Sequence, residues 1–345
     1  MDVAAALERL PKVELHCHVE GTMRPSTVMA LARKNGVPLL TENPTQLYHY
    51  TSLDTFLEIF WLVQSTLVER DDWARLAYES VLDGARHGLA YRETFFTPAR
   101  HLAAGADLAD IVAGLADGLQ AGQEDTGARV MLICAIDKAY GPAAGLELVE
   151  RLVELRRAGR PGTERVLGIG ADSTELGVDP TSFHDAFALA GKAGLRRTSH
   201  QGEVTPPWTI AAGIDVLGCE RIDHGLSILD DPALTRRLAD QRIPLTVCPN
   251  SNVRIANRVE RLELHPFPRM RDAGLLATLN TDDPALTDLD LGYEYRSAMD
   301  AFGYSWDDMV EITLDGIEAT WLDDSEKQAM RFTFRAAADR LTPQE

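Results

Sequence analysis

Short apolar runs alternate with longer amphipathic segments along almost the whole chain. Eight of the runs have the length and the apolar content of buried strands. They lie at residues 13–19, 89–98, 128–137, 166–172, 196–204, 221–227, 244–252 and 275–284. The segments between them have helical periodicity, and several end in glycine, which often terminates helices. The clearest of these segments lie at residues 71–88, 109–127, 181–194 and 231–242.

Strands that alternate with helices are typical of βαβ units and of a parallel sheet. Eight such units predict an α/β fold, a (β/α)8 TIM barrel, which needs about 250 residues. The chain has 345 residues, and we interpret residues 1–345 as a single barrel domain. The surplus lies mainly at about residues 36–66, where we expect a helical lid insertion after the first strand.

An open, doubly wound sheet is the alternative architecture. Such a sheet should carry a G-x-G-x-x-G phosphate loop after its first strand. The chain offers only "GIG" at residues 168–170, which is too short a match. The barrel is therefore favoured.

Polar side chains gather at the C-terminal ends of the predicted strands. They are His16, His18, Glu20, Asp172, His200, Glu203, His224, Asp282 and Asp283. In a TIM barrel the C-terminal ends of all eight strands meet at one mouth, where active sites are built. Because buried polar groups are costly without partners, this set predicts one functional pocket.

Two histidines in the first run, "VELHCHVEG" at residues 13–21, indicate a metal site. His16 and His18 are two positions apart, so on a strand they point to the same side. Both would face the barrel interior, where His200 and Asp282 add an imidazole and a carboxylate. These ligands suit one Zn²⁺ per chain with water in the open position. Fe²⁺ and Mn²⁺ are alternatives, because ligand types alone do not fix the metal.

Each part of this pattern also has an ordinary structural explanation. A single strand histidine is usually structural, an H-x-H pair is weak evidence, and "DD" before proline is typical of a helix start. The joint occurrence at several strand ends outweighs these explanations. The remaining histidines lie in predicted helices or loops and are predicted to be structural: His49, His87, His101, His184 and His265.

Composition and charge limit the classes of partner and the cell compartment that we expect for this chain. The net charge is −19, so a nucleic-acid partner would be repelled overall. No secretory signal or apolar stretch of membrane-spanning length is apparent, so we expect no membrane association. The four cysteines lie in apolar surroundings and predict buried thiols in a reducing compartment, hence a cytoplasmic location. The oligomeric state cannot be inferred from the sequence.

Five motifs carry a resemblance to a known family. They are "PKVELHCHVEGT", "SHQGE", "ERIDHG", "PLTVCPNSN" and "LNTDDPAL", in this order. With them the chain resembles the adenosine/adenine deaminase branch of the amidohydrolase superfamily, from about residue 11 to about residue 322. The order of all five makes the match specific. The resemblance implies a barrel enzyme that uses zinc to replace the C6 amine of a purine with oxygen.

The resemblance also implies roles for individual residues. The metal ligands would be His16, His18, His200 and Asp282. Glu203 would be the proton shuttle that faces the purine ring, and His224 would orient the attacking water. Either His224 or Asp282 could accept the proton of that water. Asp283 would contact N7, and Glu20 would lie on the side of N9 or of a ribose.

Two features favour adenine, converted to hypoxanthine and ammonia, over adenosine. Glu20 stands where the adenosine branch more usually has aspartate, and it could fill the space that ribose needs. "GADSTELG" is similar to the adenine branch, with Ser173 at the N3 edge of the purine. Gln201 and Gly202 are expected in the pocket, and Gln201 replaces a small residue. Adenosine, and an N6-substituted or otherwise modified adenine, are therefore the alternatives.

Three further alternatives stay open. Phe56, Phe60 and Trp61 fall at helical spacing and indicate either a core stripe or a hydrophobic gate that excludes water from the ring. Lys138, at the end of the third run, leaves open a carbamylated lysine and a second metal. A non-catalytic purine-binding barrel would tolerate the loss of ligands, and every expected ligand is present.

Overall fold

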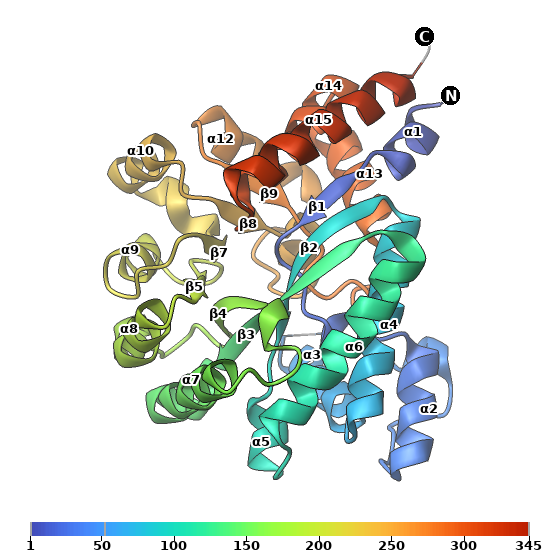
Figure 1. Ribbon diagram of the computed structural model, residues 1–345. Coiled ribbons are helices and arrows are strands. Elements are labelled where there is room, and N and C mark those ends of the chain that lie inside the picture. The colour runs from blue at the N-terminus through green and yellow to red at the C-terminus, as the bar shows by residue number, and fades with distance from the viewer. Residues whose placement is uncertain (1, 52, 344–345) are drawn as a thin grey trace.

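The strands form a closed parallel barrel in the computed structural model, which describes residues 2–51 and 53–343 (Figure 1). The strands are β1 (Lys12–Glu14), β2 (Leu89–Phe96), β3 (Arg129–Asp137), β4 (Val166–Asp172), β5 (Arg196–Arg197), β6 (His200–Gln201), β7 (Ile222–His224), β8 (Leu245–Val247) and β9 (Ala277–Leu279). Neighbours pair in chain order from β1 to β5 and from β6 to β9, always in parallel. Because β5 and β6 are two halves of one predicted run, all eight runs are confirmed.

The first and last strands join through residues of the predicted metal site. The backbone of Asp282 donates to the carbonyl of His16 at 3.1 Å, and His18 donates to the carbonyl of Asp282 at 2.8 Å. Bridges of parallel type pair Cys17 with Asp282 and His18 with Phe95. His16 and Asp282 lie about 265 positions apart in the sequence. Closure of the barrel makes them neighbours.

Helices surround the strands (Figure 1). They are α1 (Val3–Arg9), α2 (Pro25–Asn35), α3 (Leu53–Ser65), α4 (Arg70–Arg86), α5 (Ala99–Ala103), α6 (Leu108–Thr126), α7 (Gly141–Arg157), α8 (His184–Lys192), α9 (Pro207–Asp215), α10 (Pro232–Gln241), α11 (Pro249–Arg254), α12 (Phe267–Asp272), α13 (Leu291–Phe302), α14 (Trp306–Ala319) and α15 (Asp324–Leu341). Each of the four helical segments predicted above overlaps one of them: α4, α6, α8 or α10.

The local sequence sets the ends and the packing of α6. Asp107 caps its N-terminus by accepting from the backbone of Ala109 at 2.9 Å, and Gly127 ends it in the left-handed conformation. Gly118 faces α4, where an added β-carbon would lie 2.0 Å from the carbonyl oxygen of Ala74. Only glycine at this position allows the two helices to approach this closely. Helix α4 packs on β2 and helix α6 packs on β3, both from outside the barrel.

Charged residues on the barrel strands depart from the expected apolar pattern. Arg92 of β2 donates to Glu14 of β1 at 2.5 Å, and Arg221 donates to Glu93 at 2.5 Å. All four side chains are buried. Such pairs are tolerated because each charge has a close partner. They occupy strand positions that precede the catalytic ends, so they are structural.

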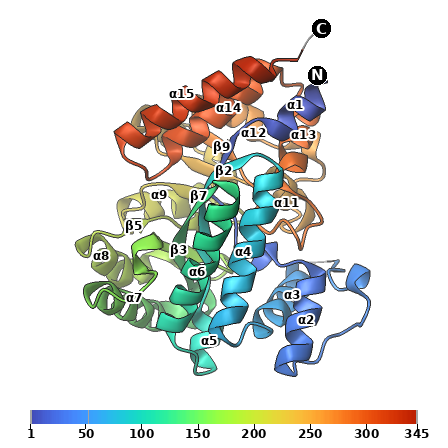
Figure 2. The ribbon, with the colours of Figure 1, turned by 45° about the vertical axis from the view of Figure 1, so that its right-hand side comes forward.

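The predicted insertion supplies a helix to the barrel mouth. Helices α2 and α3 lie at the end of the molecule opposite α14 and α15, as both ribbon views show (Figures 1 and 2). Phe56, Phe60 and Trp61 of α3 line the same cavity as the strand-end residues. That this segment closes over the cavity as a lid stays a prediction. Residues 1, 52, 344 and 345 lie outside the described part of the chain.

The structure bears on two predictions, one about the cysteines and one about membrane-spanning segments. The four cysteines are free and buried, as the apolar surroundings predicted. Within residues 2–51 and 53–343, every helix is too short or too polar to cross a membrane. The cytoplasmic location itself stays a prediction.

Candidate active site

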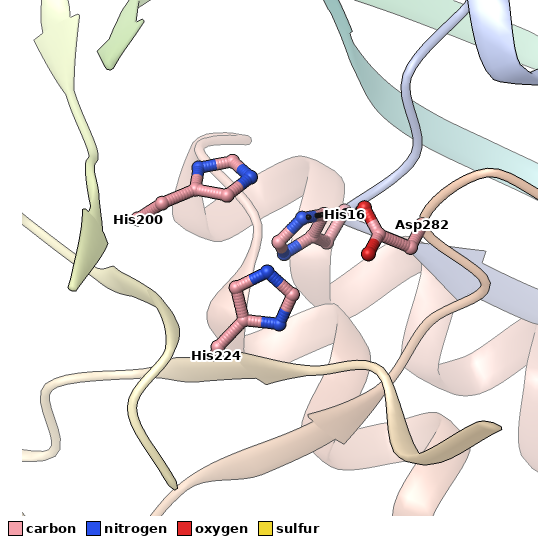
Figure 3. A group of neighbouring side chains, drawn as sticks. All are labelled: His16, His200, His224 and Asp282. Atoms are coloured by element: carbon pink, nitrogen blue, oxygen red, sulfur yellow. Dashed lines mark ion pairs between the residues drawn. The ribbon is translucent and has the colours of Figure 1, made fainter. Parts of the chain in front are cut away.

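Four predicted ligands converge at the barrel mouth. Nε2 of His16 lies 3.2 Å from Oδ1 of Asp282, and Nε2 of His18 lies 3.3 Å from the same oxygen. Nε2 of His18 and Nε2 of His200 are 3.2 Å apart. Figure 3 shows three of these side chains, together with His224, directed at one point. The four predicted ligands lie in β6 or within a few residues after β1 and β9, which are far apart in the sequence.

The other ring nitrogens of these histidines have acceptors as neighbours. Nδ1 of His16 lies 3.1 Å from the carbonyl oxygen of Thr246, which can only accept a hydrogen bond. Nδ1 of His18 faces Asp172 at 3.6 Å, and Nδ1 of His200 faces Asp223 at 3.4 Å. With their protons on Nδ1, all three rings present an Nε2 lone pair to the cluster, as in carboxylate–histidine–metal arrangements.

This arrangement fits a cation. Nε2 of His18 and Nε2 of His200 are 3.2 Å apart, so their two lone pairs can face one another only with a proton or a metal ion between them. Nε2 of His16 is buried and has no hydrogen-bond partner. Neighbouring ligands of a tetrahedral zinc ion with bonds of about 2.1 Å would be roughly 3.4 Å apart, close to the separations observed here. The donor set of three imidazoles and one carboxylate therefore fits Zn²⁺.

His224 lies close enough to the predicted ligands to be an alternative ligand of the metal. Among the described residues, ligand atoms of His16, His200, His224 and Asp282 all lie within 4.8 Å of one another, and this group leaves out His18. His18 makes shorter contacts, however, with Asp282 and His200. Nδ1 of His224 is engaged by the amide of Asn252 at 3.2 Å. We therefore retain His18 as the fourth ligand and place His224 beside the cluster.

The two aspartates of the "DD" pair differ in charge. Although burial opposes ionisation, His16 and His18 hold the pKa of Asp282 well below its usual range, which favours the anionic form of this predicted ligand. Burial and the charge of Asp282 raise the pKa of Asp283 well above its usual range. This shift favours the protonated form of Asp283, and its Oδ1 has no hydrogen-bond partner among the described residues.

Glu203 is an acid held in its protonated form near neutral pH. Burial raises its pKa to about 8, and the neighbouring carboxylates of Asp282 and Glu175 act in the same direction. Asn252 donates to Oε1 of Glu203 at 2.8 Å, which opposes the shift. The backbone of the Glu203 loop is held by Glu175, which accepts from the amides of Glu203 and Val204. Glu203 is thus fixed in position and able to donate a proton.

A cavity of about 230 Å³ adjoins the cluster. Its walls carry Phe56, Phe60 and Trp61 on one side and the ligands His18, His200 and Asp282 on the other, with His224 and Ser173. Its carboxyl groups are Asp137, Asp172, Glu175, Glu203, Asp282 and Asp283. Among the described residues that line it there is no lysine or arginine. The cavity therefore suits a small, uncharged ligand with several hydrogen-bonding atoms.

The adenosine deaminase family model matches residues 11–335. The chain belongs to the adenosine deaminase family. Adenine deaminase of Streptomyces coelicolor is 37% identical over 339 residues, which cover 97% of this chain and 97% of that protein. Adenine deaminase of Gibberella zeae is 35% identical and covers 94% of both. The resemblance inferred from the five motifs is confirmed.

Solved structures of this family share the fold. Adenine deaminase from Arthrobacter aurescens superposes with a TM-score of 0.89 at 31% identity, covering 95% of this chain and 99% of that one. An amidohydrolase from Burkholderia ambifaria, described with bound Zn, gives 0.90 at 31% identity, covering 99% and 94%. The N6-methyl-AMP deaminase of Arabidopsis thaliana gives 0.83 at 27% identity, covering 98% and 99%. The predicted TIM barrel is confirmed.

Three residues predicted to face the pocket of this deaminase-family chain do not line the cavity. Gln201 points the other way, because side chains alternate along a strand and His200 takes the inner face. Its amide donates to Ser199 at 2.9 Å, and its stem packs near Gly213 of α9. Gly202 packs against Ile210 instead. The expectation that Gln201 shapes specificity directly was wrong.

The third is Glu20, which is fully buried behind the cavity wall. Its Oε1 accepts from the backbone of Thr97 at 2.8 Å and from Gln64 at 3.5 Å. Thr97 and Gln64 line the cavity, whereas Glu20 does not. Its other carboxyl oxygen, Oε2, is buried without a hydrogen-bond partner among the described residues. Contact of Glu20 with N9 or a ribose therefore stays a prediction.

Lys138, the residue that left a second metal open, is also buried but faces the backbone. Its ammonium group donates to the carbonyl oxygen of His200 at 3.0 Å. It is not among the residues that line the cavity. We therefore assign it to holding the strand end that carries His200.

Two residues of the motif "PLTVCPNSN" bond to site residues, although the sequence predicted no role for either. Ser251 donates to Oδ2 of Asp282 at 2.6 Å, and Asn252 bonds to Glu203 and to His224. Both lie on the short helix α11, directly after β8. Polar residues that follow a barrel strand are the signal that could have identified them.

Three of the six described non-glycine residues with left-handed backbone lie at the same strand ends. Ser173, His224 and Asp282 all have φ between 64° and 68°, a left-handed conformation that residues other than glycine rarely adopt. Each such residue costs on the order of 1–3 kcal/mol and persists where surrounding structure enforces it. All three line the cavity, so the strain aims their side chains at one place.

Proposed function

We propose that this protein is a zinc-dependent adenine deaminase, which hydrolyses adenine to hypoxanthine and ammonia. The observation that carries the proposal is the convergence of four metal-ligating side chains with Glu203 and Asp283 on one small cavity. The adenine deaminases among the relatives, at 37% and 35% identity over nearly the whole chain, support the choice of substrate.

The ligands of the proposed zinc site are His16, His18, His200 and Asp282. Bound there, Zn²⁺ supplies a strong oxygen nucleophile near neutral pH, because it lowers the pKa of water to about 7. The zinc described in the Burkholderia ambifaria relative supports this choice of metal over Fe²⁺ or Mn²⁺. Ser251, which bonds to the outer oxygen of Asp282, holds that ligand in place.

Two protonated carboxyl groups recognise and activate the purine ring. Attack on C6 places electron density on N1, and Glu203 is the acid available to protonate that nitrogen. N7 of the common tautomer is a hydrogen-bond acceptor, and Asp283 carries a proton that it can donate. The raised pKa of both groups thus gives each the protonation state that its role requires.

The lining of the cavity favours a free base over larger 6-aminopurines. A volume of about 230 Å³ lies below the roughly 300–1,000 Å³ typical of pockets for drug-sized ligands. The described lining residues offer no lysine or arginine to pair with a phosphate group, and the carboxyl groups that stay ionised would repel one. The N6-methyl-AMP deaminase relative, at 27% identity, is therefore a poorer guide to the substrate than the adenine deaminases.

The test is the relative turnover of adenine, adenosine and AMP by the zinc-loaded protein. We expect kcat/KM to be highest for adenine, lower for adenosine by at least about tenfold, and lowest for AMP, whose phosphate finds no lysine or arginine among the described lining residues. The ultraviolet change from 6-amino to 6-oxo purine follows all three reactions. Glu203→Gln prepared in parallel controls for contaminating deaminases.

Equal or faster turnover of adenosine would overturn the assignment to adenine but leave the deaminase chemistry intact. Turnover of AMP at the rate of adenine would contradict the electrostatic argument. If none of the three reacts, the deaminase proposal fails for ordinary 6-aminopurines, and a modified adenine becomes the next candidate.

A further inference from the structure

Asn252 connects the two proton-handling residues of the site to a third side chain. It is fully buried on α11. Its amide nitrogen lies 2.8 Å from Oε1 of Glu203 and 3.2 Å from Nδ1 of His224. Its amide oxygen lies 3.3 Å from Nε2 of His265. The sequence had predicted His265 to be merely structural.

His265 fixes which way the amide of Asn252 points. The backbone N–H of Phe267 donates to Nδ1 of His265 at 3.0 Å, so Nδ1 is an acceptor and the ring proton is on Nε2. Burial lowers the pKa of His265 to about 3, which keeps the ring neutral. Its Nε2–H therefore donates to Asn252, and only the amide oxygen can accept it.

The amide nitrogen of Asn252 then has both hydrogens available for the active site. One is donated to Oε1 of Glu203 and the other to Nδ1 of His224. If the amide were flipped, its nitrogen would face the N–H of His265. That contact would place two donors against each other, so a single orientation is favoured.

We propose that Asn252, oriented by His265, is a positioning residue that decides where the protons of Glu203 and His224 reside. Oε1 of Glu203 accepts a hydrogen bond, so the acidic proton is carried by Oε2. Nδ1 of His224 also accepts, so the ring proton is on Nε2, and that nitrogen cannot bind the metal. The proposal rests on the roles given to Glu203 and His224 in the proposed function. It makes His224 a hydrogen-bond donor beside the zinc ligands rather than one of them.

The test replaces Asn252 with aspartate, which has nearly the same shape but presents acceptors only. In Asn252→Asp we expect the His224 proton to move to Nδ1. The ring-nitrogen NMR signals of histidine-labelled protein report that move, with His224→Gln providing the assignment. We expect kcat for adenine to fall about 100-fold while KM changes by less than about threefold and zinc content stays the same.

Asn250→Asp is the matched control on the same helix. Asn250 is also buried, but its amide donates to Glu294 and Ser297, away from the cavity. This variant should lose stability without a change in kcat or in the His224 signals. Equal losses of kcat in the two variants would overturn the proposal, because a structural role would explain both.

His265 variants keep the proposal testable if Asn252→Asp fails to fold. His265→Gln retains an N–H group for the Asn252 oxygen, whereas His265→Leu removes it. We expect His265→Leu to lower kcat about tenfold, and His265→Gln to restore most of the loss. Identical behaviour of these two variants would contradict the role of His265.

The NMR result separates this inference from the proposed function. If the wild-type protein turns over adenine while His224 carries its proton on Nδ1, the function stands and the role of Asn252 is wrong. If no 6-aminopurine reacts but the proton moves as expected in Asn252→Asp, the function fails and the positioning role stands.

Discussion

We expect Glu203→Gln to lower kcat for adenine by about 10²–10⁴, the usual contribution of a positioned general acid. Glutamine keeps the size of the side chain and can still accept from Asn252, but it has no proton of suitable acidity for N1. Zinc content and thermal stability should be unchanged, because Glu203 is not a ligand. Metal analysis and thermal unfolding alongside steady-state kinetics check both halves of this expectation.

Loss of zinc together with activity in Glu203→Gln would show that the role was assigned wrongly. Glu220→Gln, which removes a carboxylate paired with Arg196 on the surface, is the control and should leave kcat unchanged. The pH profile of the wild-type protein gives a second readout. Because the acid form of Glu203 is the active one and its pKa is raised to about 8, activity should fall as pH rises through about 8. A rate that keeps rising above that pH would contradict the assignment.

The second large effect is expected for His16→Ala. This change removes one of three imidazole ligands and leaves Oδ1 of Asp282 without its closest histidine. We expect zinc affinity to fall by at least about 100-fold, since even residues that only orient ligands contribute 10–100-fold. Activity should fall with zinc content, as measured by elemental analysis after dialysis. His184→Ala, at an exposed position on α8, should retain both.

A comparison of His18→Ala with His224→Ala identifies the fourth ligand. We expect His18→Ala to lose zinc and His224→Ala to keep it, with both losing activity. Full zinc occupancy in His16→Ala or in His18→Ala would show that the first-strand pair is structural. Loss of zinc in His224→Ala would instead favour the alternative cluster of His16, His200, His224 and Asp282.

The fold could be predicted because its strands are buried on both faces and read as apolar runs. Once the runs are placed in a barrel, topology alone brings His16 to Asp282, which the backbone hydrogen bonds between them confirm. The charged pairs between the strands could not be predicted. Glu14 and Arg92 are 78 positions apart, and only the register of β1 against β2 makes them partners.

The site was predicted well where one strand or one motif carried the information. The rule that places His200 inward should also have placed Gln201 outward, so that error could have been avoided from the sequence. Asn252 and His265 are different, because their contact depends on how the chain folds back after α11. The hydrogen bond between Glu20 and Thr97 could not be predicted for a similar reason, since it depends on the path of the chain.

The most direct measurement is a zinc titration of the chelator-treated protein with adenine as substrate. We expect no turnover without metal, a linear rise with added Zn²⁺, and a plateau at one equivalent per chain, with ammonia released in step with hypoxanthine. Adenine turnover that does not depend on metal, or a fully zinc-loaded protein that leaves adenine unchanged, would contradict this expectation.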